Sequence, residues 1–267
     1  MDRFGACRSS KIGVKTLIRL HGEGDGETLY SVYSNERLFA VVDLMEGIEG
    51  SQFEILRYKE VKKNGAPLQQ IRVVLDEGEA RSAAGALQFF KGKISMKTKP
   101  GEGGAASEIL RKAVTGILAN ESLVKQPLML PVYSGEGEIY LKPSFHHYLL
   151  LWLEQEEIIV NEKVFLACDT TISVSPVRIK LPETDDKDKV LLEMKLSGTG
   201  VCVLELPVSP QEIMCLSLFG EKMQLEGSYA VLRKGSVQLN VAGQGDSITY
   251  HFSGTGEVWI TPTKDVR

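Results

Sequence analysis

The sequence is poor in cysteine, and its cysteines lie far apart. Cys7, Cys168, Cys202 and Cys215 form no C-x-x-C pair, so neither a zinc-knuckle nor a thioredoxin-type site has support. Four scattered cysteines in a chain of 267 residues favour a reducing compartment and buried thiols over a disulfide framework.

Positive charge is not in excess either. The chain has 31 Lys and Arg residues against 35 Asp and Glu, a formal net charge of -4, whereas a nucleic-acid binder usually carries a basic balance or a basic patch. The most apolar stretch, 148–153, is far too short to span a bilayer, and the N-terminus lacks the apolar run of a signal peptide. These absences predict a cytoplasmic bacterial protein. Nucleic acid is a disfavoured partner, a local basic patch aside, and nothing in the sequence indicates membrane association.

What the chain has in quantity is short β-branched segments bounded by Gly, Pro, Asn, Asp or Ser. Gly occurs 26 times, mostly at such boundaries, where a tight turn or a positive φ is needed. This pattern predicts a mainly β fold, such as a sandwich, barrel or β-helix. The clearest predicted strands are 71–75, 139–141, 158–160, 172–174, 201–206, 237–241 and 257–261.

One segment, 105–120, has helical periodicity. Its apolar residues recur at three- and four-residue spacing, Ser107 is placed to cap its N-terminus, and Asn120 lies near its other end. We expect one inserted amphipathic helix, packed on the β body. Its polar face carries only Arg111 and Lys112 as cations, which disfavours a membrane-surface helix.

An internal repeat organises the rest of the chain. A Gly-x-Gly pair followed by a strand that ends at proline occurs at 135–143, 198–207 and 254–262. A second pattern precedes each copy and has two anchors eight residues apart: Ala86 and Ile94, Val164 and Ile172, Tyr229 and Val237. Each unit is too small to bury its own apolar face. The repeat therefore predicts three units that share a core around an approximate threefold axis, with glycines that permit a bulge or a close strand approach. A phosphate-binding role for these glycines is disfavoured, because a strand and not a helix follows them.

These motifs resemble a known family. The segments 74–79, 83–87, 116–122, 137–143, 165–169 and 254–262 are together similar to the altered-inheritance-of-mitochondria family, number twenty-four, whose fold resembles the tryptophan RNA-binding attenuation protein (TRAP). The resemblance covers about residues 53–262. It implies a β-prism of three similar sheets and no activity, and it links mitochondrial members to inner-membrane organisation. We therefore predict an N-terminal β extension over 1–50 and a TRAP-like three-repeat β domain over 51–267.

The candidate metal ligands are His and Asp residues for which a surface role is the simpler interpretation. A cupin-like metal site needs several histidines and a carboxylate around one cavity, but neighbours such as His146 and His147 face opposite ways on a strand. We expect all four histidines, His21, His146, His147 and His251, to be surface or interface residues. The group Asp185, Asp186 and Asp188 lacks the glycine and the distal glutamate of a calcium loop, and is expected to form a solvated hairpin tip.

Other chemistry has even less support. The sequence has no G-x-S-x-G elbow and no histidine close to a cysteine. Five aromatic residues suggest base stacking, but Lys and Arg are not interleaved with them at the needed density, which favours packing. They are Phe89, Phe90, Tyr148, Trp152 and Trp259. Trp259 aligns with Tyr140 and Leu204 in the other copies, so we expect it to be mostly buried.

The sequence thus predicts no catalytic, cofactor-binding or metal-binding residues. The leading hypothesis is a non-enzymatic structural or interaction protein without a cofactor, which forms a homo-oligomer or binds a protein partner through prism faces or sheet edges. The alternative is a small-ligand or nucleic-acid binding module, by fold analogy alone. A metal-dependent enzyme is the least favoured class.

Overall fold

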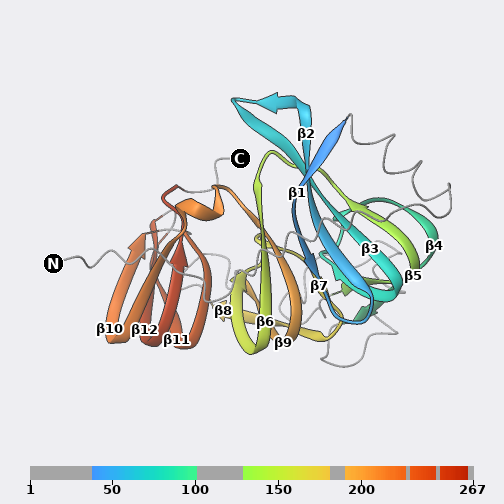
Figure 1. The fold of residues 1–267 in the computed structure, drawn as a ribbon. Helices are drawn as coiled ribbons and strands as arrows, with labels where there is room; N and C mark the ends of the chain where they lie inside the picture. The colour runs from blue at the N-terminus through green and yellow to red at the C-terminus, as the bar shows by residue number, and fades with distance from the viewer. Residues whose placement is uncertain (1–37, 101–128, 181–189, 227–228, 245–246, 264–267) are drawn as a thin grey trace, which may run out of the picture.

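The computed structural model describes residues 38–100, 129–180, 190–226, 229–244 and 247–263. Within them the chain is built from strands and one short 3₁₀ turn, so the predicted mainly β class is confirmed (Figure 1). The predicted helix over 105–120 lies outside these residues. No helix among those described is long and apolar enough to cross a membrane. The elements are β1 (Phe39–Glu46), β2 (Ser51–Lys63), β3 (Ala66–Ser82), β4 (Leu87–Pro100), β5 (Met129–Leu141), β6 (His147–Asn161), β7 (Phe165–Asp169), β8 (Ile172–Lys180), β9 (Val190–Leu206), η2 (Pro210–Glu212), β10 (Met214–Glu226), β11 (Ala230–Gln244) and β12 (Ser247–Ile260).

The strands form one open, antiparallel hydrogen-bonded network. Its longest path runs β1-β2-β3-β7-β9-β6-β11-β12-β10, while β4 joins through β5 and β8 joins through β9. Four strands are therefore edges among the described residues: β1, β4, β8 and β10. Figure 1 shows β4 and β10 at opposite ends of the molecule.

Each Gly-x-Gly strand is the centre of a three-stranded unit. In unit 1, β5 lies between β3 and β4; in unit 2, β9 lies between β6 and β8; in unit 3, β12 lies between β10 and β11. The short strand β7 precedes β8 and also pairs with β9, so it belongs to unit 2.

The three units share their register around the glycines, which confirms the sequence repeat. On the first strand of each unit, a buried leucine faces the second glycine and a register shift follows: Leu75 with Gly137, Leu153 with Gly200 and Leu218 with Gly256. On the opposite neighbour, the second sequence anchor faces the first glycine: Ile94 with Gly135, Ile172 with Gly198 and Val237 with Gly254.

The first anchors are equivalent as well. In every unit the backbone carbonyl of the first anchor accepts a hydrogen bond from an N–H at the end of the Gly-x-Gly strand. These bonds run from Lys142 to Ala86 over 2.7 Å, from Glu205 to Val164 over 2.8 Å, and from Thr261 to Tyr229 over 3.0 Å. The two sequence patterns therefore interlock in the same way three times.

The glycines allow a close strand approach, as predicted. Gly254 has a φ of +117°, which L side chains rarely adopt. A Cβ at this position would overlap the backbone carbonyl oxygen of Ser236 on β11. The sequence pattern treated such glycines as strand boundaries, but they continue the ladder, so β5, β9 and β12 are longer than the predicted strands.

The buried apolar side chains form three clusters. One includes Phe53, Ile71 and Leu141, another includes Val160, Ile172 and Leu196, and the third is built around Phe252 and Val258. The middle cluster draws on several strands of unit 2 and on β11, so burial ties the units together.

The N-terminal strand described, β1, is hydrogen-bonded to β2 through most of its length. The segment between them contains two residues with positive φ, Glu49 at +56° and Gly50 at +78°, and forms a tight turn. The part of the predicted N-terminal extension that precedes residue 38 lies outside the described residues. The division into an extension over 1–50 and a domain over 51–267 stays a prediction.

Candidate functional site

The exposed sheet edges carry most of the exposed large apolar side chains of the described chain. Its exposed large apolar side chains, other than Leu38, Val61 and Trp152, all lie on three edge strands. They are Val41, Val42 and Leu44 on β1, Phe89, Phe90 and Met96 on β4, and Met214 and Phe219 on β10. Phe219 is 79% exposed. An exposed apolar edge offers unpaired N–H and C=O groups beside apolar contacts, which is what a further strand needs in order to pair.

The fourth edge is different. β8 carries Pro176 and none of the exposed large apolar residues. Proline has no N–H to donate and blocks pairing on an edge. Among the described residues, β8 thus has a proline in its middle, whereas β1, β4 and β10 carry the exposed apolar side chains.

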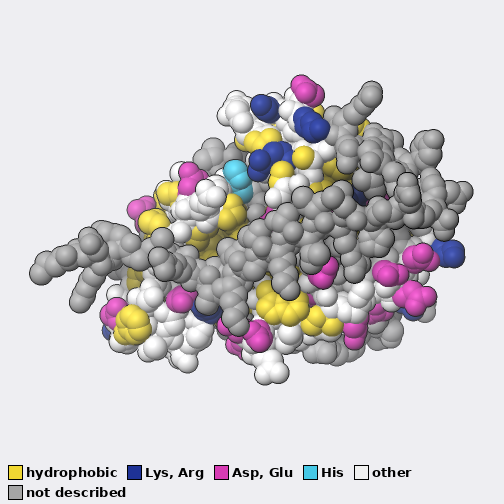
Figure 2. Space-filling model, viewed as in Figure 1, with side chains coloured by type: hydrophobic (Ala, Val, Ile, Leu, Met, Phe, Trp, Pro, Cys, Tyr) yellow, Lys and Arg dark blue, Asp and Glu magenta, His cyan; other side chains and the backbone are white. Residues whose placement is uncertain are grey.

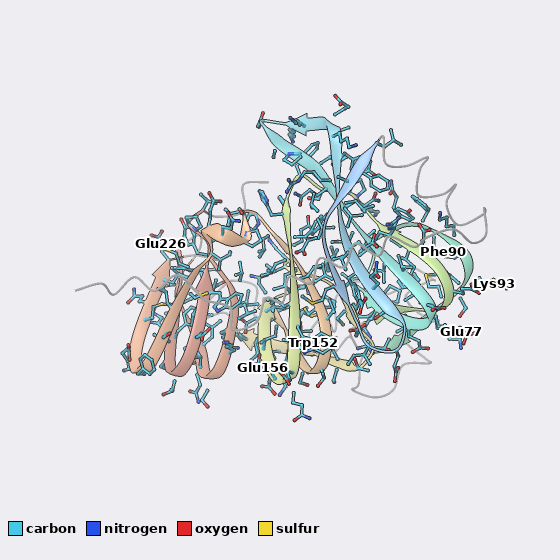
Figure 3. All side chains as sticks on the ribbon, in the orientation of Figure 1. Glu77, Phe90, Lys93, Trp152, Glu156 and Glu226 are labelled. Atoms are coloured by element: carbon cyan, nitrogen blue, oxygen red, sulfur yellow. The ribbon has the colours of Figure 1, made fainter. Side chains whose placement is uncertain are left out.

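Charge also differs between the edges. β4 carries Lys91, Lys93 and Lys97, whereas β10 carries Glu221 and Glu226 with Lys222. Figure 3 shows Phe90 and Lys93 at the β4 end of the molecule and Glu226 at the β10 end. The two ends of the molecule are thus complementary in charge and alike in apolar character.

A buried carboxylate, Asp169, sits where β7 meets β9. It is 1% exposed and accepts hydrogen bonds from the hydroxyl of Ser51, the N–H of Ile48 over 3.2 Å and the N–H of Val201 over 2.7 Å. Burial raises its pKa above the ordinary aspartate value, while these hydrogen bonds act to lower it. The three donors belong to the fold itself, so Asp169 holds the turn after β1 against unit 2.

A second buried charged residue, Arg233, also forms hydrogen bonds within the fold. Its Nη2 donates to Oε2 of Glu193 over 2.6 Å and its Nη1 donates to the carbonyl of Val237 over 2.7 Å. Both charged residues are buried. This buried ion pair joins β9 to β11, and neither residue lines the groove described below.

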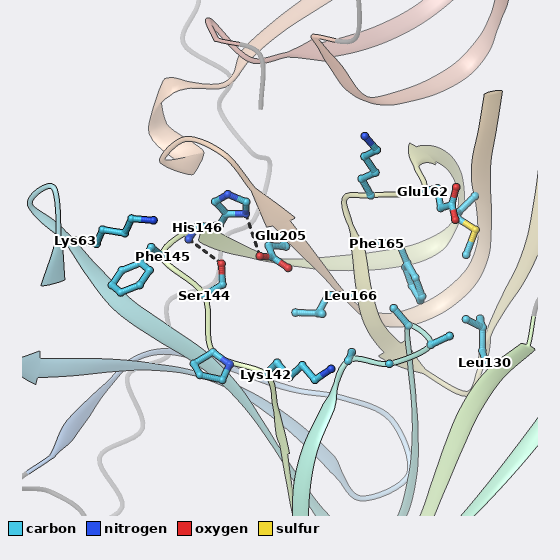
Figure 4. Close-up of a pocket in the computed structure, with 17 residues that line it drawn as sticks. Lys63, Leu130, Lys142, Ser144, Phe145, His146, Glu162, Phe165, Leu166 and Glu205 are labelled. Carbon is cyan, nitrogen blue, oxygen red and sulfur yellow. Dashed lines mark hydrogen bonds and ion pairs between the residues drawn. The ribbon is translucent and has the colours of Figure 1, made fainter. Parts of the chain in front are cut away.

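An open groove of about 810 Å³ lies beside the turn between β5 and β6 (Figure 4). Its wall includes the apolar Leu130, Phe165 and Leu166, and its rim includes Lys63 and Lys142. His146 Nδ1 lies 3.0 Å from Oε1 of Glu205 in this groove, and the N–H of His146 donates to Oγ of Ser144 over 2.9 Å. The sequence did not reveal this groove, because its residues come from seven separate segments.

The structure does not bring the histidines together. His146 lines the groove, His147 begins β6, and His251 lies on β12 in unit 3. Burial lowers the pKa of His147 below the ordinary value. Among the described residues, no three His, Cys, Asp or Glu side chains are placed to hold a metal ion. His21 and the aspartates 185, 186 and 188 lie outside them.

The aromatic residues have unequal burial. Tyr148 is 4% exposed and Trp259 is partly buried against the unit 2 cluster, with its indole N–H donating to Glu257 over 3.0 Å. This burial agrees with the expectation that most of the Trp259 side chain is buried. Phe89 stacks on Tyr140 with ring centroids 4.5 Å apart, yet it is exposed, as are Phe90 and Trp152. Figure 3 shows Phe90 and Trp152 well apart, so they do not form one stacking platform.

On the face shown in Figure 2, hydrophobic side chains lie in separate patches.

Two of the three cysteines that the structure describes are buried, as predicted. Cys168 and Cys202 are free thiols, are fully buried and face each other across β7 and β9. Burial raises the pKa of Cys168 to about 12. Cys215 is partly exposed, and Cys7 lies outside the described residues.

Comparisons with known proteins agree with this fold. The family model described as mitochondrial biogenesis AIM24 matches residues 61–263. Among solved structures, the X-ray crystal structure of protein SPYM3_0169 from Streptococcus pyogenes is similar, with a TM-score of 0.55 and 16% sequence identity, over 79% of this chain and 94% of that one. At this identity the likeness shows the fold alone. No curated protein matches the chain.

Proposed function

This chain belongs to the mitochondrial biogenesis AIM24 family, and from that premise we propose that it is a non-enzymatic structural or interaction protein that associates with copies of itself through its sheet edges. One observation carries the proposal: the exposed large apolar residues gather on three edge strands, whereas β8, the edge without them, has Pro176 in its middle. Proteins that stay monomeric usually protect such edges with charge, proline or a covering segment.

The partners of the buried charged residues support the proposal that the protein is not an enzyme. Asp169, Glu193 and Arg233 have perturbed or desolvated environments of the kind found in active sites. Here each is bound to groups of the fold and none lines the groove. Such an arrangement favours a structural role for each of them.

The finer architecture is part of the same proposal. Equivalent registers in all three units support repeats related by pseudo-threefold symmetry, as in a TRAP-like β-prism. A cytoplasmic location, expected from the sequence, also belongs to the proposal.

The test is the mass of the full chain in solution. Light scattering during size exclusion should give a mass well above the 29.4 kDa of one chain. The variant Phe90→Lys with Phe219→Lys places charge on two edges and should shift the mass toward the monomer. Trp152→Lys is the matched control, because Trp152 is similarly exposed at 42% but lies on the internal strand β6. A wild-type monomer at tens of micromolar would refute the proposal.

A second candidate function rests on the groove. Its lysine rim, formed by Lys63, Lys142 and Lys163 above apolar residues, suits a small anionic ligand with an apolar part. Native mass spectrometry of freshly purified protein tests this function. A bound small molecule that is lost on Lys142→Glu supports ligand binding, and absorbance at 260 nm that copurifies would point to nucleic acid instead.

A further inference from the structure

Neighbouring units are joined by two short strand pairings, which we call seams. In each seam, a set of three residues that follows the leucine of one unit pairs with a set of three residues that precedes the second anchor of the next unit. Seam 1 joins β3 to β7 through Ala80–Asp169, Arg81–Cys168 and Ser82–Ala167, and seam 2 joins β6 to β11 through Ile158–Lys234, Ile159–Arg233 and Val160–Leu232.

The two seams use the same register. Relative to Leu75 and Leu153, the pairing residues are the fifth, sixth and seventh that follow. Relative to the anchors Ile172 and Val237, their partners are the third, fourth and fifth that precede. The repeat therefore specifies how one unit attaches to the next, as well as how each unit is built.

The same rule applied to unit 3 and unit 1 specifies a third seam. Counting from Leu218 and from Ile94 gives the pairs Met223–Lys91, Gln224–Phe90 and Leu225–Phe89. In the structure β10 pairs with β12 and β4 pairs with β5, and the two strands lie at opposite ends of the molecule (Figure 1). Both halves of the third seam are thus present and are not joined to each other within the chain.

Burial distinguishes these positions from their equivalents. At the formed seams, the fourth and fifth residues before the anchor are buried: Ala167 is 1% exposed, Cys168 0%, Leu232 3% and Arg233 7%. The equivalent residues of unit 1, Phe89 and Phe90, are 48% and 39% exposed. On the other side, Ala80, Ser82, Ile158 and Val160 are buried, whereas the apolar Met223 and Leu225 are only partly buried. Large apolar residues therefore occupy positions that are buried wherever a seam exists.

We propose that the third seam forms between two copies of the chain, with β10 of one copy paired to β4 of the next in the register given above. This inference rests on the proposed self-association and names its interface. The two strands also carry opposite charges beside the predicted pairs, Lys93 on β4 and Glu221 and Glu226 on β10, which favours their association. Because β4 and β10 are different surfaces, the contact is heterologous: copies join head to tail and build a ring or a longer assembly.

The test uses disulfide cross-linking of the full chain in a Cys7→Ser, Cys215→Ser background that melts like wild type. One preparation carries Phe90→Cys and another carries Gln224→Cys. Under mild oxidation the mixture should give a disulfide-linked dimer at least several-fold more abundantly than either preparation alone. The matched control replaces Phe90→Cys with Trp152→Cys, which is similarly exposed but outside the predicted register, and should give only the background amount.

Two results would overturn the inference. One is a mixture that cross-links no better than the control. The other is a double variant, Phe90→Cys with Gln224→Cys, that forms only an intrachain bond, since the prism would then close within one chain. The wild-type mass separates the two proposals: an oligomer without this cross-link leaves edge-mediated association standing and refutes the register, whereas a monomer refutes both.

Discussion

The backbone N–H of Val201 on β9 donates a 2.7 Å hydrogen bond to Oδ2 of Asp169 at the end of β7. Asp169→Ala would leave this donor and the N–H of Ile48 without their acceptor, and would leave the hydroxyl of Ser51 with only the carbonyl of Ile48. An unsatisfied buried donor costs about 1–3 kcal/mol, so we expect the free energy of unfolding to fall by about 3 kcal/mol, measured by urea denaturation. Ser51→Ala removes a single donor and should cost about 1 kcal/mol. Equal losses in the two variants would contradict this role.

The same carboxyl group should make stability depend on pH. Burial raises the pKa of Asp169 in the folded state above its ordinary value of 3.8, so the folded chain holds this proton to a higher pH than the unfolded chain does. In that window the unfolded state binds fewer protons, and the unfolding free energy contributed by Asp169 falls as pH rises, then becomes constant above the raised pKa. The difference between wild type and Asp169→Asn, measured by urea titrations at several pH values, should show this fall. A difference that grows with pH would mean that the folded state lowers the pKa.

Glycine at position 254 is required for two reasons, and one of them can be isolated. Gly254 and Gly220 both have positive φ, +117° and +92°, but a Cβ would overlap the Ser236 carbonyl only at Gly254, because space is open at Gly220. We expect Gly220→Ala to cost about 1–2 kcal/mol from backbone strain alone. Gly254→Ala should cost at least twice as much, since the strand β11 must also move. Similar losses in urea denaturation would show that the close approach adds nothing.

The two tryptophans provide a matched pair for packing. Trp259 packs against the unit 2 cluster, whereas Trp152 is 42% exposed. Trp259→Ala should lower the free energy of unfolding by about 2–3 kcal/mol, less than the roughly 3–5 kcal/mol of a fully buried aromatic. Trp152→Ala should cost less than about 1 kcal/mol. If the two variants have equal thermal midpoints, Trp259 does not contribute to the core.

Thiol reactivity should separate the cysteines. In a Cys7→Ser background at pH 8, Ellman's reagent should react with Cys215 in the folded protein and with Cys168 and Cys202 only after denaturation. The reason is that burial raises the pKa of Cys168 to about 12 and that of Cys202 well above the ordinary value, so neither forms a thiolate. Rapid reaction of all three thiols in the native state would contradict their burial.

The repeat was predictable because its physical requirements are local. The Gly-x-Gly pairs and the two apolar anchors eight residues apart are visible in the sequence. The strand period of two then determines the register. The seams were not predictable, since three-residue pairings between distant strands leave no periodic signal. Nor does alternation reveal which strand is an edge, so Phe89 and Phe90 were expected to pack and are exposed instead. Asp169 ends the apolar run 165–168, a signal that could have marked it, but its donors at Ile48 and Val201 are distant in sequence.

Asp169 and its donor Ile48 are far apart in sequence, so they are synthesised at different times. Ile48 leaves the ribosome 121 residues before the carboxylate that will accept its N–H. At roughly 5–20 residues per second, this interval lasts about 6–24 s. The β1–β2 hairpin is therefore made early, and its turn is hydrogen-bonded to Asp169 only after β7 has emerged.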